Sequence, residues 1–249
     1  KELEIATIVS EKRENKVGTF PISIDYDEFS DQAKSEEVSK MTEELKEGYP
    51  GQKIMLGIDR LDYSKGIPQR LKAYRRLLDK YPELHTKVKL IQIMVPSRED
   101  IAKYADLKSE IEQLVGEING KFSQPGWITI QYFYDSLSRI ELLAYYRVSD
   151  VALVTPLKDG MNLVSKEYCA ANIEKDGVLI LSEFAGAKYQ FKDDALLGNP
   201  FDERSLVDNM QKALSMEIKE KQRRMENMQN SIRKFDIYWW VDTFLKAAR

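Results

Sequence analysis

The chain has 249 residues, a net charge of -3 at pH 7 and 43% hydrophobic residues, enough to build the core of one large or two small domains. Its 38 basic and 41 acidic residues are mixed along the chain, so no excess of positive charge favours nucleic acid as a partner. No apolar run is long enough to span a bilayer, and the start shows no signal-peptide pattern, so we expect a cytoplasmic protein without a membrane partner. The first residue is Lys1 rather than Met, which suggests a fragment or a processed product.

The single cysteine and the single histidine limit the chemistry of this chain. Cys169 lies among apolar residues of an expected helix, which favours a buried structural thiol over a nucleophile. With His85 as the one imidazole, a zinc site and a Cys–His or Ser–His catalytic pair are both disfavoured. We therefore expect chemistry that rests on carboxylates, cations and backbone groups, with no metal ion and no cofactor.

In chain order, the first expected elements are two strands, 3–9 and 17–24, joined by a charged turn at 10–16. A polar helix is expected over 30–47, because Val38, Met41 and Leu45 recur near the spacing of one helical face. The segment before this helix has the character of a connector rather than of a domain.

From residue 53 onward, short apolar strands alternate with helices. The expected strands cover 53–58, 88–95, 128–133, 151–154 and 178–181. One expected helix starts near Pro68, another ends near Ile118, and the others cover 138–147, 163–171, 203–214 and 217–234. This alternation predicts an α/β fold with a doubly wound parallel sheet.

The last segment, 235–249, is unusually aromatic and includes the run FDIYWWVDTFL. Its aromatic side chains either fill the core of one domain or lie on a terminal helix that crosses to a partner domain. The chain contains no Gly-x-Gly-x-x-Gly and no Walker motif, which argues against an ordinary dinucleotide site and a P-loop nucleotide site.

The stretch TPLKDGMNLVSKE at 155–167 follows an apolar strand and leads into a helix. Such a unit builds ligand sites at the carboxyl edge of a parallel sheet. Gly160 permits close approach of the backbone, and free N–H groups at the helix start suit phosphate oxygens. Asp159 and Glu167 can accept hydrogen bonds from sugar hydroxyl groups. The alternative is structural: Asn162 caps the helix, Asp159 favours its N-terminus and Glu167 pairs with a lysine on a solvated face.

A second loop with complementary chemistry follows the strand at 53–58. Arg60 can donate two hydrogen bonds to phosphate oxygens, and Lys65 can act as a point charge on a diphosphate. Alternatively, both cations pair with the neighbouring Asp59 and Asp62 on the surface. Because both loops should face the same sheet edge, together they favour a ligand with phosphate and sugar groups.

Several stretches resemble signature sequences of glycosyltransferase family 20, the trehalose-6-phosphate synthase family. They are GIDRLDYSKG at 57–66, DGMNLVSKE at 159–167 and SEFAGA at 182–187, accompanied by PISID at 21–25, PSR at 96–98 and INGK at 118–121. The likeness runs from about Gly18 to the C-terminus, with the motifs in the order of the family.

Members of this family have the two-domain GT-B architecture, so the resemblance implies that the chain is a C-terminal, donor-binding half. Residues 1–29 would be connecting strands from an N-terminal domain outside this sequence, 30–234 a Rossmann-like nucleotide-sugar-binding domain, and 235–249 a C-terminal aromatic helix. The implied reaction transfers glucose from UDP-glucose to glucose 6-phosphate, with retention at the anomeric carbon and without a metal ion. Alone, the chain is expected to be inactive.

The resemblance also implies roles for individual residues. Asp159, Arg60 and Lys65 are the implied catalytic residues: Asp159 grips hydroxyls of the transferred glucose, while the two cations hold the donor diphosphate. Glu167 is the implied acceptor for the ribose hydroxyls, and Arg98 meets the phosphate of the acceptor sugar. The full implied donor-binding set is Arg60, Lys65, Leu137, Asp159, Gly160, Met161, Asn162, Leu163, Val164, Ser165, Lys166 and Glu167.

Two alternatives to this reading of the sequence stay open. Leu137 matches a position beside the base where some relatives have Phe, so a relative with another donor base, or with an acceptor such as glycerol phosphate or a cyclitol phosphate, fits the same motifs. A non-catalytic module that binds a nucleotide sugar, or a protein through its aromatic C-terminus, fits the same fold.

Overall fold

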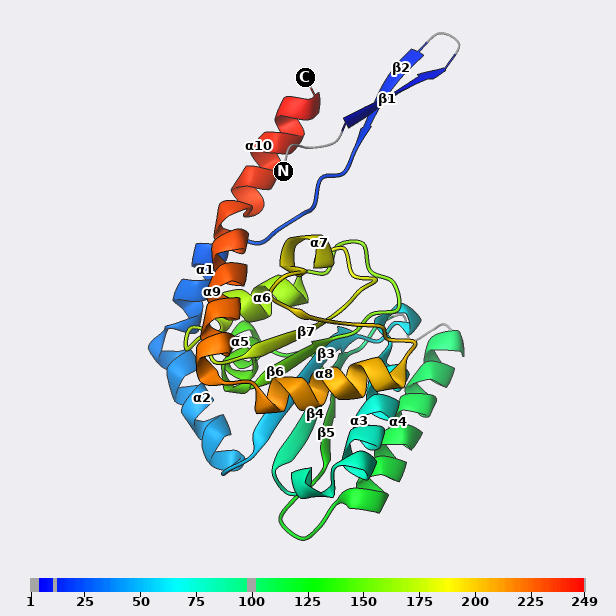
Figure 1. The fold of residues 1–249 in the computed structure, drawn as a ribbon, viewed down its shortest axis with the longest axis vertical. Coiled ribbons are helices and arrows are strands. Elements are labelled where there is room, and N and C mark those ends of the chain that lie inside the picture. The colour runs from blue at the N-terminus through cyan, green and yellow to red at the C-terminus, as the bar shows by residue number, and fades with distance from the viewer. Residues whose placement is uncertain (1–4, 11–12, 98–101, 249) are drawn as a thin grey trace.

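The computed structural model of the chain describes residues 5–10, 13–97 and 102–248. Its centre is a parallel sheet of six strands in the order β5-β4-β3-β6-β7-β8. The strands are β3 (Lys53–Arg60), β4 (Val88–Val95), β5 (Ile130–Tyr134), β6 (Val151–Val154), β7 (Val178–Ser182) and β8 (Leu196–Gly198). The predicted doubly wound parallel α/β fold is therefore confirmed (Figure 1).

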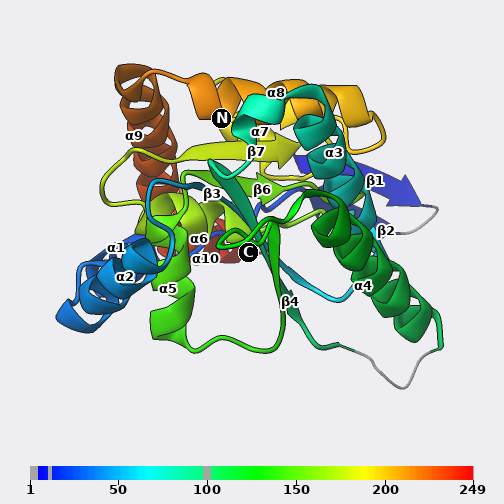
Figure 2. The ribbon, with the colours of Figure 1, turned by 90° about the horizontal axis from the view of Figure 1, so that it is seen from below.

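Helices cover both faces of the sheet (Figure 2). One face carries α3 (Ile67–Lys80), α4 (Ala102–Phe122) and α8 (Glu203–Ser215). The other carries α1 (Tyr26–Ala33), α2 (Glu36–Gly48), α5 (Arg139–Val148), α6 (Val164–Ala171) and α9 (Ile218–Lys234). The short α7 (Lys188–Phe191) precedes β8, and α10 (Ile237–Ala248) follows α9.

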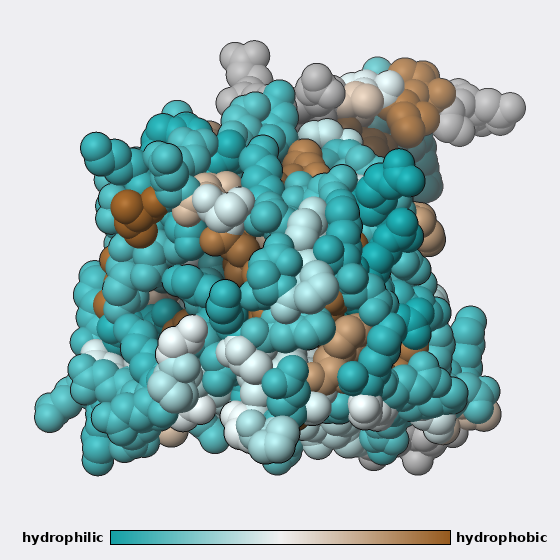
Figure 3. All heavy atoms as spheres, turned by 60° about the horizontal axis from the view of Figure 1, so that its bottom comes forward, coloured by the Kyte–Doolittle hydropathy of each residue, from teal (hydrophilic) through white to brown (hydrophobic). Residues whose placement is uncertain are grey.

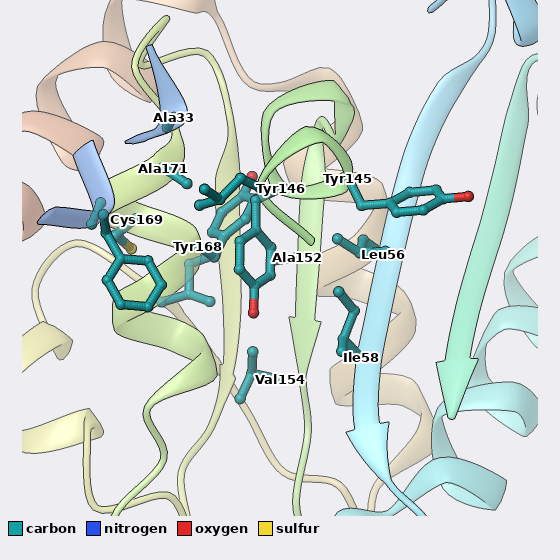
Figure 4. Close-up of a cluster of buried hydrophobic side chains, with 14 of the residues drawn as sticks. Ala33, Leu56, Ile58, Tyr145, Tyr146, Ala152, Val154, Tyr168, Cys169 and Ala171 are labelled. Atoms are coloured by element: carbon teal, nitrogen blue, oxygen red, sulfur yellow. The ribbon is translucent and has the colours of Figure 1, made fainter. Parts of the chain in front are cut away.

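The strands are mostly apolar because helices cover both faces of the sheet, and β6 and β7 are buried along their whole length. In β3, Leu56 and Ile58 point to the cluster beneath α5 and α6, whereas Met55 belongs to the cluster beneath α3. Figure 4 shows Leu56 and Ile58 pointing to the same cluster as Tyr146 of α5 and Tyr168 of α6. The hydrophobic residues are thereby drawn inward, and the face of the molecule in Figure 3 is mostly hydrophilic with small, scattered apolar areas.

The expected strand at 17–24 is wrong. Strand β1 (Ile5–Ser10) pairs with β2 (Arg13–Gly18) in an antiparallel hairpin, so most of the expected charged turn belongs to β2. Charged side chains are tolerated there because β2 is exposed to solvent along nearly its whole length. The strand ends before Pro21, which lacks the N–H group that a ladder of hydrogen bonds requires.

The single helix expected over 30–47 is also wrong, because two helices occupy this region. Asp25 caps α1 by accepting a hydrogen bond from the Glu28 N–H (3.0 Å), so the first helix begins earlier than expected. Ser35 accepts a hydrogen bond from the Val38 N–H and starts α2. Each of the two helices thus begins at its own capping side chain, and Lys34, the C-cap of α1, directly precedes the cap of α2. The sequence pattern also missed α7 and β8, which are only four and three residues long.

Helix α10 and the hairpin extend beyond one end of the sheet domain (Figure 1). Between them runs the segment 19–25, which α10 holds by hydrogen bonds from Trp240 Nε1 to the Phe20 carbonyl oxygen (2.9 Å) and from the Ile237 N–H to the Ile24 carbonyl oxygen (3.0 Å). The aromatic end of the chain therefore lies partly on its own N-terminal segment.

Within the described ranges, none of the helices combines the length and apolar character needed to cross a membrane.

Lys166 of α6 holds the same segment from the other side. Its ammonium group donates a hydrogen bond to the Ile22 carbonyl oxygen (2.8 Å), and the residue is 3% exposed. Burial lowers the pKa of Lys166 to about 8 from its ordinary value of 10.5, because desolvation disfavours the charged form.

Lys166 should make the stability of the chain rise with pH. Between pH 8 and 10.5 the unfolded chain binds more protons at this lysine than the folded chain, so its contribution to the free energy of unfolding increases as pH rises through that window. We expect the difference in unfolding free energy between the parent and Lys166→Met to shift in favour of the parent by up to about 1.4 kcal/mol per pH unit.

Urea unfolding at pH 7.5 to 9.5 would measure this shift, with the exposed Lys40→Met as the control for loss of one positive charge. A difference that stayed constant or fell with pH would contradict the burial of a charged ammonium group at this position.

Candidate functional site

The candidate site lies at the carboxyl edge of the sheet, where β3 and β6 are neighbours. Strand β3 pairs with β4 on one side and with β6 on the other. The chain leaves β3 for α3 on one face of the sheet and leaves β6 for α6 on the opposite face. The two loops therefore diverge from adjacent strands, an arrangement that forms ligand-binding crevices in open α/β sheets.

Backbone contacts fix these two loops against each other. The Leu157 N–H donates to the Ser64 carbonyl oxygen (2.7 Å), which ties the loop after β6 to the loop after β3. Gly66 has a φ of 67°, and a Cβ at this position would overlap the Thr155 carbonyl oxygen. Glycine is therefore required by both its left-handed conformation and its close approach to the neighbouring loop.

The structure brings Lys65 and Asp159 together from these two loops. Lys65 Nζ lies 2.7 Å from Asp159 Oδ2, and the side chains are 16% and 15% exposed. Burial opposes ionisation of Asp159, but the hydrogen bond and charge of Lys65 outweigh it and hold the pKa of Asp159 below its ordinary value. The other oxygen of Asp159 accepts a hydrogen bond from the Met161 N–H (3.2 Å). An ionised carboxylate and a cation thus meet at the edge of the sheet.

The alternative pairing of Arg60 and Lys65 with the neighbouring acids does not occur among the described residues. Asp62 instead accepts hydrogen bonds from the N–H and hydroxyl groups of Ser64 (2.8 and 2.7 Å), and Asp59 pairs with a different arginine. Arg60 is exposed at the end of β3. Its guanidinium group therefore remains available to a ligand.

The loop after β7 supports Asp159 from the other side. The Asp159 N–H donates to the Phe184 carbonyl oxygen (3.2 Å), and the Gly186 N–H donates to the Asp159 carbonyl oxygen (2.7 Å). A Cβ at Gly186 would overlap the carbonyl group of Gly160. The SEFAGA motif at 182–187 thereby holds the backbone around Asp159.

The first turn of α6 supplies backbone donors beside this pair. Asn162 Oδ1 accepts a hydrogen bond from the Ser165 N–H (2.9 Å), although Asn162 lies one residue before Leu163, the N-cap position of α6. Within the described ranges, the N–H groups of Leu163 and Val164 have no acceptor in the protein. Gly160 and Met161 are exposed in front of them. Two free N–H groups at a helix start favour an anionic ligand.

Glu167 lies one turn further along α6 and is half-buried. Tyr146 donates a hydrogen bond to its Oε2 atom (2.9 Å), so the alternative of a lysine partner on a solvated face is wrong. Burial raises the pKa of Glu167, while the Tyr146 hydrogen bond partly offsets that rise. The Oε1 atom can still accept hydrogen bonds from hydroxyl groups.

The remaining expected residues differ in their surroundings. The ammonium group of Lys166 donates to the Ile22 carbonyl oxygen, and the backbone N–H of Lys166 donates to the Leu163 carbonyl oxygen (2.8 Å). The side chain and the backbone N–H of Lys166 therefore already have partners in the protein. Leu137 is half-buried and packs against the core cluster beneath α5. Arg98, expected to meet the acceptor phosphate, lies outside the described residues.

Sequence reasoning missed a buried arginine directly behind this site. Arg70 of α3 is fully buried and places its Nη1 atom 2.6 Å from Oδ2 of Asp59. A signal was available in Gly57, because a glycine inside an apolar strand often marks the close approach of another group. Here a Cβ at Gly57 would overlap the guanidinium group of Arg70.

In the described part of the chain, no group of three or more His, Cys, Asp or Glu side chains is arranged to hold a metal ion.

Replacing Gly186 by alanine should destabilise the chain by about 1–3 kcal/mol, because the added methyl group meets backbone that cannot rotate away. The exposed Gly116 in α4 is the matched control, since no atom lies within 4 Å of its added Cβ, and Gly116→Ala should stabilise the helix by roughly 0.5–1 kcal/mol. Thermal or urea unfolding measures both changes. Equal stability of Gly186→Ala and the parent would contradict the close contact of the two loops.

Comparison with known proteins places this geometry in a family. The family model of glycosyltransferase family 20 matches residues 2–249. The chain is 43% identical over 231 residues to alpha,alpha-trehalose-phosphate synthase (UDP-forming) A of Dictyostelium discoideum, a match that covers 93% of this chain and 31% of that protein. It is 44% identical over 229 residues to the 56 kDa subunit of alpha,alpha-trehalose-phosphate synthase (UDP-forming) of Saccharomyces cerevisiae, covering 92% of this chain and 46% of that protein.

Solved structures give the same result. An alpha,alpha-trehalose-phosphate synthase (UDP-forming) from Burkholderia xenovorans in complex with glucose-6-phosphate matches with a TM-score of 0.95 and 36% identity, over 100% of this chain and 55% of that one. The Escherichia coli protein bound with UDP-2-fluoro glucose matches with a TM-score of 0.87 and 37% identity, over 98% of this chain and 55% of that one. The chain thus spans about half the length of these structures, and it belongs to glycosyltransferase family 20.

Proposed function

We propose that this chain is the donor-binding half of a retaining glycosyltransferase that moves glucose from UDP-glucose to glucose 6-phosphate and yields trehalose 6-phosphate. The observation that carries the proposal is the pairing of Lys65 with Asp159 at the edge of the sheet, beside the free N–H groups of Leu163 and Val164. A cation and two N–H donors suit a diphosphate, and the carboxylate suits sugar hydroxyl groups. The names of the relatives support the same donor and acceptor.

The proposed division of roles follows from which atoms are available. Lys65 has three ammonium protons and uses one toward Asp159, so it can also donate to a diphosphate oxygen. Arg60 is exposed beside it and can donate two parallel hydrogen bonds. Asp159 is kept ionised and accepts hydroxyl groups of the transferred glucose, whereas Glu167 accepts those of the ribose through Oε1.

These groups favour the transition state over the bound substrate. When the bond between glucose and UDP breaks, negative charge grows on the leaving diphosphate. Cations and N–H groups that already point there stabilise the growing charge more than the initial charge. In the proposed retaining mechanism the leaving phosphate accepts the proton of the attacking hydroxyl group. No side chain of this chain is then required as a base.

The acceptor site requires a second half of the protein in this proposal. Exposed apolar side chains on α10 and on the hairpin would contact that half, among them Val9, Val17, Tyr238, Val241, Phe244 and Leu245. Both elements extend beyond the sheet domain in the same general direction (Figure 1). Closure of the second half over the crevice would exclude water from the reacting centre.

Removing either cation should weaken donor binding. We expect Lys65→Ala and Arg60→Ala each to cost roughly 1.5–3 kcal/mol of UDP-glucose binding, the range of a hydrogen bond to a charged group. Lys72→Ala is the control, because Lys72 of α3 pairs with Glu110 on the helical surface away from the loop. Calorimetric titration measures the affinities, with GDP-glucose and ADP-glucose as comparison donors. Unchanged affinity in both loop variants would contradict the proposal that Arg60 and Lys65 bind the donor diphosphate. Tighter binding of GDP-glucose or ADP-glucose would show that the donor carries another base.

The isolated chain should bind the donor without turnover. We expect no release of UDP from UDP-glucose and glucose 6-phosphate by the 249-residue chain, and recovery of UDP release when the matching N-terminal half is added. A coupled assay for UDP measures both reactions. Turnover by the chain alone would refute its dependence on a second half.

A further inference from the structure

Arg70 is the most deeply buried charge near the candidate site and has no role in the donor contacts proposed above. It belongs to α3, the helix that begins directly after the loop of Lys65, and none of it is exposed. Besides its ion pair with Asp59, it donates from Nε to Thr155 Oγ1 (3.0 Å) and from Nη1 to Gln92 Oε1 (3.0 Å). It therefore joins α3 to three adjacent strands: near the carboxyl ends of β3 and β6, and in the middle of β4.

Arg70 does not use all of its hydrogen-bond donors, so hydrogen bonding alone does not explain its burial. Its Nη2 atom is buried and has no hydrogen-bond partner among the described residues. A buried donor without a partner is costly. Gly57 further gives up a side chain to make room for the guanidinium group. We therefore infer that the positive charge of Arg70 matters more than its hydrogen bonds.

The charge of Arg70 acts on Asp59, which lies between the two loops of the site. Asp59 is the penultimate residue of β3, immediately before Arg60, and is almost fully buried. Burial raises the pKa of Asp59, and the Arg70 guanidinium opposes this rise, with further influence from the charges of Lys65 and Asp159. The charge of Asp59 therefore interacts with both members of the half-buried Lys65–Asp159 pair.

We propose that Arg70 is a positioning residue for donor binding, which neutralises Asp59 so that Lys65 remains paired with Asp159 and the crevice stays attractive to a diphosphate. Without Arg70, the buried carboxylate of Asp59 could keep its charge only by taking Lys65 from Asp159, which would move this cation away from the sheet edge. The inference rests on the proposed function, since it takes a nucleoside diphosphate sugar as the ligand.

Two single substitutions and their combination separate this role from a structural one. Arg70→Met keeps the bulk of the side chain and removes its charge, Asp59→Asn removes the opposing charge, and the double variant has neither. A structural role predicts that both single variants lose affinity together, because each breaks the same buried pair. A charge role predicts that Arg70→Met loses affinity and that Asp59→Asn does not.

The experiment measures melting temperature and UDP-glucose affinity for these variants of the 249-residue chain. We expect the melting temperature to fall in both single variants. We expect Arg70→Met to bind UDP-glucose at least tenfold more weakly, Asp59→Asn to bind as tightly as the parent or more tightly, and the double variant to return to within about threefold of the parent. Arg76→Met, an exposed arginine on α3, should bind like the parent.

Loss of affinity in Asp59→Asn similar to that in Arg70→Met, or no recovery in the double variant, would overturn the proposal and leave Arg70 a structural residue. If Arg70→Met does not fold, the double variant decides. Affinity within about threefold of the parent supports the charge role, because neither position is then charged, and a loss of tenfold or more overturns it.

Inorganic pyrophosphate, titrated in parallel, separates this inference from the proposed function. Binding of pyrophosphate without binding of UDP-glucose would refute the donor assignment, and the order of the variants with pyrophosphate would still test Arg70. Binding of neither ligand by the parent would overturn both.

Discussion

Parallel pairing of β3 with β6 is the constraint on which the candidate site depends. Met55 and Leu56 of β3 pair with Val151 and Ala152 of β6, so the two strands end at the same edge although they are far apart in the sequence. The helices that follow them pack on opposite faces of the sheet, and the loops must separate as they leave the edge. The meeting of Lys65 with Asp159 follows from this topology.

Charge is arranged in two layers at this edge. The outer pair, Lys65 and Asp159, retains some exposure and can exchange partners with a ligand, whereas the inner pair, Arg70 and Asp59, is fully enclosed. A buried ion pair recovers its desolvation cost only in part, so it is a weak source of stability. Its value at this position lies in leaving the inner layer nearly neutral. The outer layer then determines which ligand is attracted.

Local sequence signals predicted most of the sheet domain because its central strands are buried on both faces and are rich in apolar residues. They failed where local and tertiary preferences differ. Strand β2 is charged and exposed, and only its pairing with β1 makes it a strand. The start of α1 depends on the capping hydrogen bond of Asp25 and the start of α2 on that of Ser35, and such bonds are weak signals within a long polar stretch.

The fold class, the two loops that carry the candidate site and the family can all be read from the amino-acid sequence, because strand periodicity and loop motifs are local properties. Which charges pair depends on how the chain folds. From the sequence, the neighbouring Asp59 and Asp62 were possible ion-pair partners of Arg60 and Lys65. In the folded chain Lys65 instead pairs with Asp159, which belongs to the other loop. The tertiary structure also decided that Arg70, on an ordinary amphipathic helix, is buried beneath the site. Such pairings depend on distances between strands that are adjacent in space and remote in sequence.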